Sequence, residues 1–195
     1  MNKIILATRN RHKILEIQTI LSDLRLEILT LNDFPDVPLL REDGETFQEN
    51  SLQKAREVFR LTHIASLADD SGLEVFFLNG RPGVLSARYA GSEATDEKNN
   101  EKLLGEMRGV AARRRKARFR AVLTLVEDKS TDATEGICLG KLAESPRGTN
   151  GFGYDPIFIP DGFTRTYAEL TAEEKNQISH RSKALAGMKE VLRGR

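Results

Sequence analysis

The sequence predicts an α/β fold around a mixed β-sheet, and three features of the chain lead to that prediction. In the first half, short apolar runs alternate with amphipathic segments, a pattern typical of strands joined by helices. Alternating residues over 118–126 predict a long strand, and residues 136–142 predict its neighbour. At 195 residues the chain is long enough to fold as one domain, 1–195, with a sizeable core.

Composition narrows the classes of protein that fit. Apolar residues make up 39% and charged residues 30% of the sequence, as in soluble globular proteins. The formal net charge of +1 gives no electrostatic reason to expect nucleic acid or a membrane as a partner. Cys138 is the only cysteine, which excludes an internal disulfide and fits a reducing compartment. No apolar run approaches the roughly 20 residues of a membrane span, so the expected location is the cytoplasm.

A polar loop separates the first predicted strand from the first predicted helix. Residues 4–7 predict the strand, and Ile14, Ile17 and Leu21 recur at helical spacing. Free N–H groups and the positive end of the helix dipole suit an anion such as phosphate. The alternative is that Asn10 simply caps a surface helix. The residues of this candidate phosphate loop are Thr8, Arg9, Asn10, Arg11, His12 and Lys13.

An irregular acidic segment leads into the second predicted helix. Residues 33–45 contain two prolines and several acids, and Thr46 with Glu49 forms a capping box that begins the helix. Glu42 can fold back towards a metal from this segment, although a solvated loop acid is the alternative. Lys54 lies on the same helix as Glu49, and an ordinary exposed side chain is the alternative for it.

Asp69 and Asp70 lie between two apolar runs, 64–68 and 73–77, that predict buried strands. Ser71-Gly72 is typical of a turn, so we expect the two carboxylates at a strand end. A buried carboxylate needs a cation or hydrogen-bond donors, and Mg²⁺ is usually held by one or two carboxylates with substrate phosphates. A turn on the surface is the alternative.

The one basic run covers residues 113–116, and Arg118 and Arg120 extend it. A nucleic-acid-binding module using residues 113–120 is one interpretation. We favour a solvated hairpin end followed by a strand, because aromatic residues are not interleaved through the run.

Three glycines surround two aromatic residues within 148–156. Glycine permits a ligand to approach the backbone closely, and Phe152 and Tyr154 can stack on a planar group. The alternative is an aromatic pair that anchors the loop to the core.

Two helices are predicted to close the chain. Thr171 and Glu174 form the capping box of a short helix that carries Lys175. His180 and Arg181 begin the last helix, away from its apolar stripe. A basic residue at a helix N-terminus opposes the dipole, which favours a bound anion or electron-rich ligand over ordinary surface residues.

Together these motifs resemble the inosine triphosphate pyrophosphatase family, which hydrolyses deaminated purine nucleoside triphosphates. At two positions, Arg9 and Asn150, the family commonly has glycine. The matching segments follow the family's order and cover nearly the whole chain: 7–13, 42–50, 68–73, 82–89, 148–156 and 179–181.

The resemblance implies an elongated fold of two lobes around a long twisted mixed sheet, with the active-site cleft between the lobes. It also implies a homodimer that requires Mg²⁺. The reaction would convert ITP, dITP or XTP and water to the monophosphate and pyrophosphate, which clears these nucleotides from the pool.

The resemblance also assigns roles to residues. Glu42 and Asp70 would hold Mg²⁺, Asp70 would accept the proton of the attacking water, and Asp69 would lie beside the metal or contact it through water. The phosphate loop, with Lys54, would hold the triphosphate. The remaining substrate-binding residues would be Ser71 near the metal, Phe152, Gly153, Tyr154 and Asp155 at the base and sugar, and Lys175, His180 and Arg181 at the base edge.

Other classes of function predict different behaviour. A nucleic-acid-binding module would bind oligonucleotides in a salt-sensitive way without turnover. The intact pair of Glu42 and Asp70 argues against a nucleotide sensor that does not hydrolyse its ligand. The segment 179–181 argues against a pyrophosphatase for modified pyrimidines.

Overall fold

The computed structural model describes residues 2–195, and in this part of the chain strands form a sheet in the order β2-β1-β3-β4-β5-β6. β1 pairs parallel with β2 and β3, whereas β5 pairs antiparallel with β6, so the predicted α/β fold with a mixed sheet is confirmed. The strands are β1 (Lys3–Leu6), β2 (Glu27–Thr30), β3 (Ser66–Val75), β4 (Lys116–Val126), β5 (Thr131–Leu142) and β6 (Phe158–Pro160). The α-helices are α1 (Arg11–Leu21), α2 (Phe47–Thr62), α3 (Asp96–Glu106), α4 (Ala172–Ile178) and α5 (His180–Arg193).

The chain divides into two compact units. Unit 1 comprises the residues up to Asp70 together with Ala121–Gly136 and Arg181–Arg195. Unit 2 comprises Ser71–Arg120 and Ile137–His180. Among the described residues, no helix combines the length and the apolar character needed to cross a membrane.

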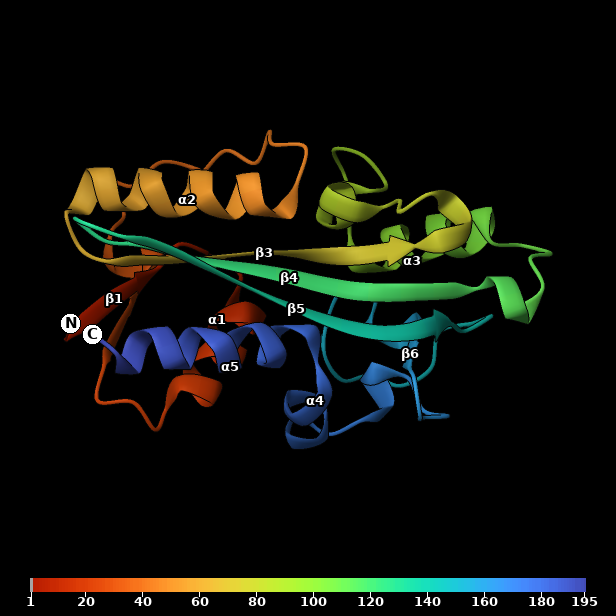
Figure 1. Ribbon diagram of the computed structural model, residues 1–195. Helices are drawn as coiled ribbons and strands as arrows, with labels where there is room; N and C mark the ends of the chain where they lie inside the picture. The colour runs from red at the N-terminus through yellow and green to blue at the C-terminus, as the bar shows by residue number, and fades with distance from the viewer. Residues whose placement is uncertain (1) are drawn as a thin grey trace. The chain divides into compact units, whose positions relative to one another are not determined.

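Alternation of side chains along β1 gives unit 1 an apolar core on each face of its strands. Ile4 and Leu6 pack in a cluster with α1 and α5, whereas Ile5 and Ala7 pack in a cluster with α2. Accordingly, α2 covers one face of β1 and β3, and α1 and α5 cover the other (Figure 1).

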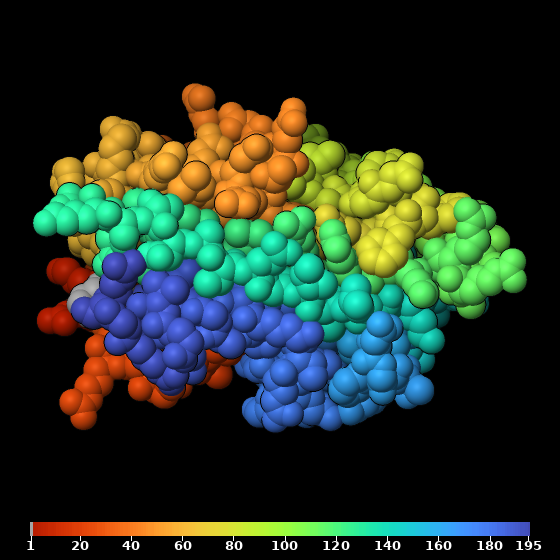
Figure 2. All heavy atoms as spheres, in the orientation of Figure 1, coloured from red at the N-terminus to blue at the C-terminus, as the bar shows by residue number. Residues whose placement is uncertain are grey.

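Helix α5 also lies against the start of β5 within unit 1. Figure 2 shows the blue surface of α5 beside the first residues of this strand. The hydroxyl of Thr134 donates a hydrogen bond to the carbonyl of Ala184 at 2.9 Å. The last helix is therefore fixed both by its apolar stripe and by a polar contact to the strand.

An aromatic cluster lies in the core of unit 2. The ring of Phe119 on β4 packs edge-on against Phe158, with centroids 4.8 Å apart, and stacks on Tyr167 at 5.7 Å. His180 lies parallel to Phe119 at 4.6 Å. Leu103 of α3 belongs to the same core, so α3 packs on this part of the sheet.

The predicted helix starts are confirmed by their caps. The side-chain oxygen of Asn10 accepts hydrogen bonds from the N–H groups of His12 and Lys13. Thr46 and Thr171 each form the capping box that their sequences predict. These caps satisfy N–H groups that the first turn of a helix leaves without partners.

The turn predicted at Ser71-Gly72 is wrong, because β3 passes through both residues without interruption. A Cβ atom on Gly72 would lie 2.3 Å from Oγ of Ser86 and 2.5 Å from the carbonyl oxygen of Gly83. Glycine is therefore required for the close approach of the 3₁₀ helix Gly83–Arg88 to the strand. The N–H of Leu73 donates to Oγ of Ser86 at 2.9 Å across this contact.

The basic run does not form a continuous exposed patch. Arg115 is buried, and its guanidinium donates to the carbonyls of Met107, Leu142 and Ala143 at 2.8, 3.0 and 2.6 Å. Arg118 pairs with Glu74 at 2.5 Å. Guanidinium groups used in this way are structural, which argues against the nucleic-acid-binding interpretation.

We expect Gly72→Ala to lower the free energy of unfolding by about 1–3 kcal/mol, because the added methyl group must displace Ser86 or backbone. Denaturant unfolding measures this change. Gly105→Ala is the matched control: a Cβ there meets nothing within 4 Å, and alanine in α3 should be neutral or stabilise by up to about 1 kcal/mol. Equal stability of the Gly72→Ala protein and the wild type would contradict the packing argument.

Candidate active site

The candidate phosphate loop between β1 and α1 is held by its own side chains. Oγ of Thr8 accepts from the N–H of Asn10 at 3.1 Å, and Asn10 caps α1 as described above. The cap predicted as the alternative interpretation is thus present. Arg11 and His12 are exposed in the first turn of α1.

Arg9, where the family commonly has glycine, supports the neighbouring segment. Its guanidinium donates to the carbonyl of Leu31 at 3.1 Å and to that of Val37 at 2.8 Å. Backbone carbonyls outside a helix or sheet need such partners when they are covered. The departure from glycine therefore has a structural explanation in unit 1.

Asp69 is the centre of an ion network that joins three elements of unit 1. Its carboxylate is 2.5 Å from Nζ of Lys13 on α1 and 2.9 Å from Nε of Arg181 on α5. Arg181 also contacts Glu16 of α1 at 2.5 Å. Burial by itself would raise the pKa of Asp69, but the charges of Arg181 and Lys13 outweigh it and hold that pKa well below its usual range.

Asp70 lies in a separate set of contacts with α2. Its Oδ2 accepts from Asn50 at 3.1 Å, and its Oδ1 lies 3.1 Å from Nζ of Lys54. The same ammonium contacts Oε1 of Glu42 at 2.5 Å. Glu42 and Asp70, distant in sequence, thus both contact the ammonium of Lys54.

Burial and the neighbouring charges shift the pKa values of Asp70 and Lys54. Burial raises the pKa of Asp70, and the opposing charge of Lys54 does not cancel the effect. Burial acts to lower the pKa of Lys54, but the charges of Asp70 and Glu42 outweigh it, so its pKa is raised. In this environment burial therefore favours the protonated form of Asp70 more than water does.

The donor set fits Mg²⁺ with substrate and water completing the coordination. Among residues 2–195 no group of three or more His, Cys, Asp or Glu side chains could hold a metal ion. Mg²⁺, however, is usually bound through one or two carboxylates plus phosphates and waters, and Glu42 with Asp70 supplies two. In this structure the ammonium of Lys54 lies between these two carboxylates.

The glycine-rich segment of unit 2 is folded around Asp155. Oδ2 of Asp155 accepts from the N–H of Phe152 at 3.0 Å and from Nζ of Lys175 at 2.6 Å. Nζ of Lys175 is also 4.9 Å from the centroid of the Phe152 ring. Gly151 has φ of +77°, and a Cβ there would lie 2.0 Å from Asp155. The loop thus brings Phe152, Asp155 and Lys175 together.

Tyr154 and His180 lie deeper in unit 2 than the sequence indicates. Tyr154 is 4% exposed, and its hydroxyl donates to the carbonyl of Ser86 at 2.9 Å. Burial raises the pKa of this tyrosine. His180 is 3% exposed and stacks on Phe119. Tyr154 therefore anchors the loop to the core, as the alternative interpretation of the segment 148–156 stated.

Ser71, the predicted substrate-binding residue near the metal, is half-buried within β3.

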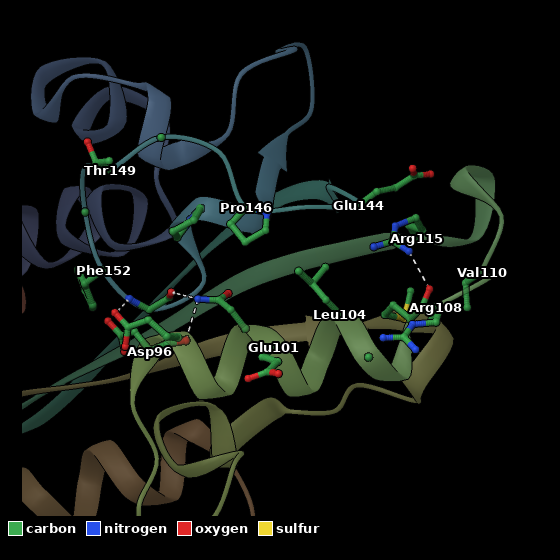
Figure 3. Close-up of a pocket in the computed structure, with 18 of the residues that line it drawn as sticks. Asp96, Glu101, Leu104, Arg108, Val110, Arg115, Glu144, Pro146, Thr149 and Phe152 are labelled. Carbon is green, nitrogen blue, oxygen red and sulfur yellow. Dashed lines mark hydrogen bonds between the residues drawn. The ribbon is translucent and has the colours of Figure 1, made fainter.

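Two residues of α3 that sequence reasoning missed also hold the loop. Oδ2 of Asp96 accepts from the N–H of Gly153 at 2.6 Å, and Nδ2 of Asn100 donates to its carbonyl at 2.8 Å. Only their spacing of four on a helix could have signalled a shared face. Figure 3 shows the adjoining pocket, with Asp96, Glu101 and Leu104 on one side and Pro146, Thr149 and Phe152 on the other.

This fold and these residues define an α/β protein of the nucleotide-hydrolase type, and comparison with known proteins gives the family. The model of the Ham1 family matches residues 4–191, so the chain belongs to that family. A relative from Shouchella clausii (strain KSM-K16), named dITP/XTP pyrophosphatase, is 46% identical over 195 residues, covering 100% of this chain and 98% of the relative. One of the same name from Geobacter sulfurreducens is 48% identical, covering 98% and 97%.

Solved structures of similar proteins point to the same family. A HAM1 protein from Coxiella burnetii aligns with a TM-score of 0.91 and 42% identity over all of both chains. The Ham1 protein of Staphylococcus aureus aligns with a TM-score of 0.89 and 38% identity over 99% of each. The family expected from the motifs is confirmed.

We expect Asp69→Asn to lower the free energy of unfolding by about 3–5 kcal/mol, because it removes the buried counter-charge of Lys13 and leaves Arg181 with Glu16 alone. Chemical unfolding at pH 7 measures the change. Asp23→Asn, which disrupts an exposed pair with Lys189, is the control and should have little effect. A variant as stable as the wild type would show that the network is dispensable.

The pH dependence gives a second readout of Asp69. Its pKa is lowered in the folded state, so below about pH 4 only the unfolded state takes up its proton. The free energy of unfolding should therefore fall with falling pH by up to about 1.4 kcal/mol per unit from this residue. Asp69→Asn should lack that part of the slope.

Proposed function

We propose that the chain hydrolyses dITP, XTP and ITP to the nucleoside monophosphate and pyrophosphate in a reaction that requires Mg²⁺. The observation that carries the proposal is the meeting of Glu42, Asp70 and a cation in unit 1, in a chain of the Ham1 family. The names of its relatives supply the substrate class. The expected homodimer and cytoplasmic location remain predictions.

The residues of unit 1 suit the triphosphate end of such a substrate. Glu42 and Asp70 would hold Mg²⁺, which when bound neutralises phosphate charge and orients water. Asp70 would take the proton from the attacking water onto its carboxylate. Lys13 would contact the phosphates, with its position fixed by Asp69.

The residues of unit 2 suit a purine. Phe152 would stack on the base, and Asp155 holds both that loop and the ammonium of Lys175. Hypoxanthine and xanthine carry a keto oxygen at position 6, which accepts hydrogen bonds, whereas adenine carries an amino group. Lys175 and His180 would donate to the keto oxygen or to neighbouring acceptors, and so would Arg181, which belongs to unit 1.

We expect Asp70→Asn to lower kcat by about 10²-fold or more, the scale of losing a general base. Pyrophosphate release from dITP at saturating Mg²⁺ measures it, with the thermal midpoint showing that the protein is folded. Glu42→Gln should cost less, since water can replace one ligand. Near-wild-type turnover by Asp70→Asn would remove Asp70 from catalysis.

We expect Arg181→Ala to narrow the ratio of kcat/KM for dITP over dATP by roughly 5- to 150-fold, equivalent to about 1–3 kcal/mol for an unmet donor. Phe152→Ala should reduce both values alike, because every purine has a π-face. Glu16→Gln is the matched control: it removes the other ion pair of Arg181 without removing a base donor, and should leave the ratio unchanged. The same unchanged ratio in Arg181→Ala would exclude Arg181 from base recognition.

A further inference from the structure

The ammonium of Lys54 makes all the hydrogen bonds that it can. Its three donors meet Oε1 of Glu42 at 2.5 Å, Oδ1 of Asp70 at 3.1 Å and the backbone carbonyl of Asp69 at 2.9 Å. The side chain is 5% exposed. A buried lysine with complete coordination by oxygen is a built cation site, not a loose surface pair.

Two of these three acceptors are the carboxylates assigned to Mg²⁺. An ammonium and a divalent ion both seek hard oxygen acceptors, and two cations at one place repel each other strongly in a buried environment. Lys54 in its present position and a metal bound by Glu42 and Asp70 therefore exclude each other.

We propose that Lys54 is a placeholder cation: it neutralises Glu42 and Asp70 in the metal-free protein, and it leaves them when Mg²⁺ binds. This inference rests on the metal site of the proposed function and deepens it, because it names the residue that sets metal affinity.

The surroundings allow one side of the site to move while the other stays fixed. Asp70 lies in β3, and its second oxygen is held by Asn50, which is fully buried. Oδ1 of Asn50 also accepts from the N–H of Gly44, which ties the Glu42 segment to the same residue. Glu42 itself lies outside any helix or strand with its side chain 34% exposed, and Lys54 has a flexible four-carbon stem.

The backbone carbonyl of Asp69 can keep the ammonium of Lys54 at the site after it leaves the carboxylates. The carbonyl of Asp69 accepts from Lys54 and also lies 3.4 Å from Nζ of Lys13. By pivoting on this carbonyl, Lys54 joins Lys13 as a second cation for the triphosphate. Metal and nucleotide binding then strengthen each other, and by linkage the effect is reciprocal.

The test is calorimetric titration of the nucleotide-free protein with Mg²⁺. Lys54→Met and Lys54→Gln should both bind Mg²⁺ more tightly than the wild type, by about tenfold or more, because the competing charge is gone. Lys189→Met, which removes an ion-paired lysine elsewhere in unit 1, should bind as the wild type does. Unchanged or weaker binding in both Lys54 variants overturns the proposal, and so does tightening in the Met variant alone, since that would be a packing effect.

Thermal unfolding gives an independent readout. Without metal, Lys54→Met should have a lower midpoint than the wild type, and saturating Mg²⁺ should raise its midpoint by more than it raises that of the wild type. Equal shifts in the two proteins overturn the proposal.

Hydrolysis of dITP by the wild type with and without Mg²⁺ separates this inference from the proposed function. Mg²⁺-dependent turnover together with unchanged affinity in the Lys54 variants overturns the placeholder role and leaves the function intact. Tighter Mg²⁺ binding in both variants without any turnover overturns the proposed function and supports the exchange of cations.

Discussion

The alternation of side chains along β3 is the constraint on which the unit 1 site depends. Successive side chains of a strand point to opposite faces, so the carboxylates of Asp69 and Asp70 have different partners. Asp69 faces α1 and α5, where it meets Lys13 and Arg181, and Asp70 faces α2, where it meets Asn50 and Lys54. The two adjacent carboxylates thus have different roles: Asp69 joins helices to the strand, and Asp70 faces a cation.

The cost of burying charged groups explains why each of these carboxylates is paired with a basic residue. A buried ion pair is seldom a net source of stability, because desolvation offsets the attraction, but removing one partner is strongly destabilising. Each buried charge here has a partner from another element: Asp69 has Arg181, and Asp70 has Lys54. The pairs specify how the helices register on the strand, and so fix where Lys13 and Glu42 lie.

Unit 2 solves a different problem, that of holding an aromatic ring on an irregular loop. Asp155 is 2% exposed and accepts both from the backbone of Phe152 and from Lys175, while Asp96 accepts from Gly153. Positive φ at Gly151 and Gly153 permits the tight path of the backbone. The ring is therefore presented by a loop whose backbone polar groups have partners, which suits binding without large rearrangement.

The sequence by itself determined the helix caps and the other local interactions. Asn10, Thr46 and Thr171 predicted helix starts correctly, because a cap needs only residues two or three positions away. The ordered motifs likewise predicted the family. The strands Glu27–Thr30 and Phe158–Pro160 were missed, since such short strands have little pattern of their own and form by pairing with a neighbour.

Only the tertiary structure decided contacts between distant residues. Ser71-Gly72 has the chemistry of a turn, yet pairing in the sheet keeps it extended, and the small size of glycine serves packing against Ser86. Arg181 opposes a helix dipole, which led us to expect a bound anion or electron-rich ligand beside it, but it is buried against Asp69, 112 positions earlier. Lys54 was a candidate phosphate ligand, and packing placed it between the carboxylates of Glu42 and Asp70. The physical reason is the same in each case: a buried charge takes the partner that the folded chain brings to it, and sequence spacing does not encode that partner.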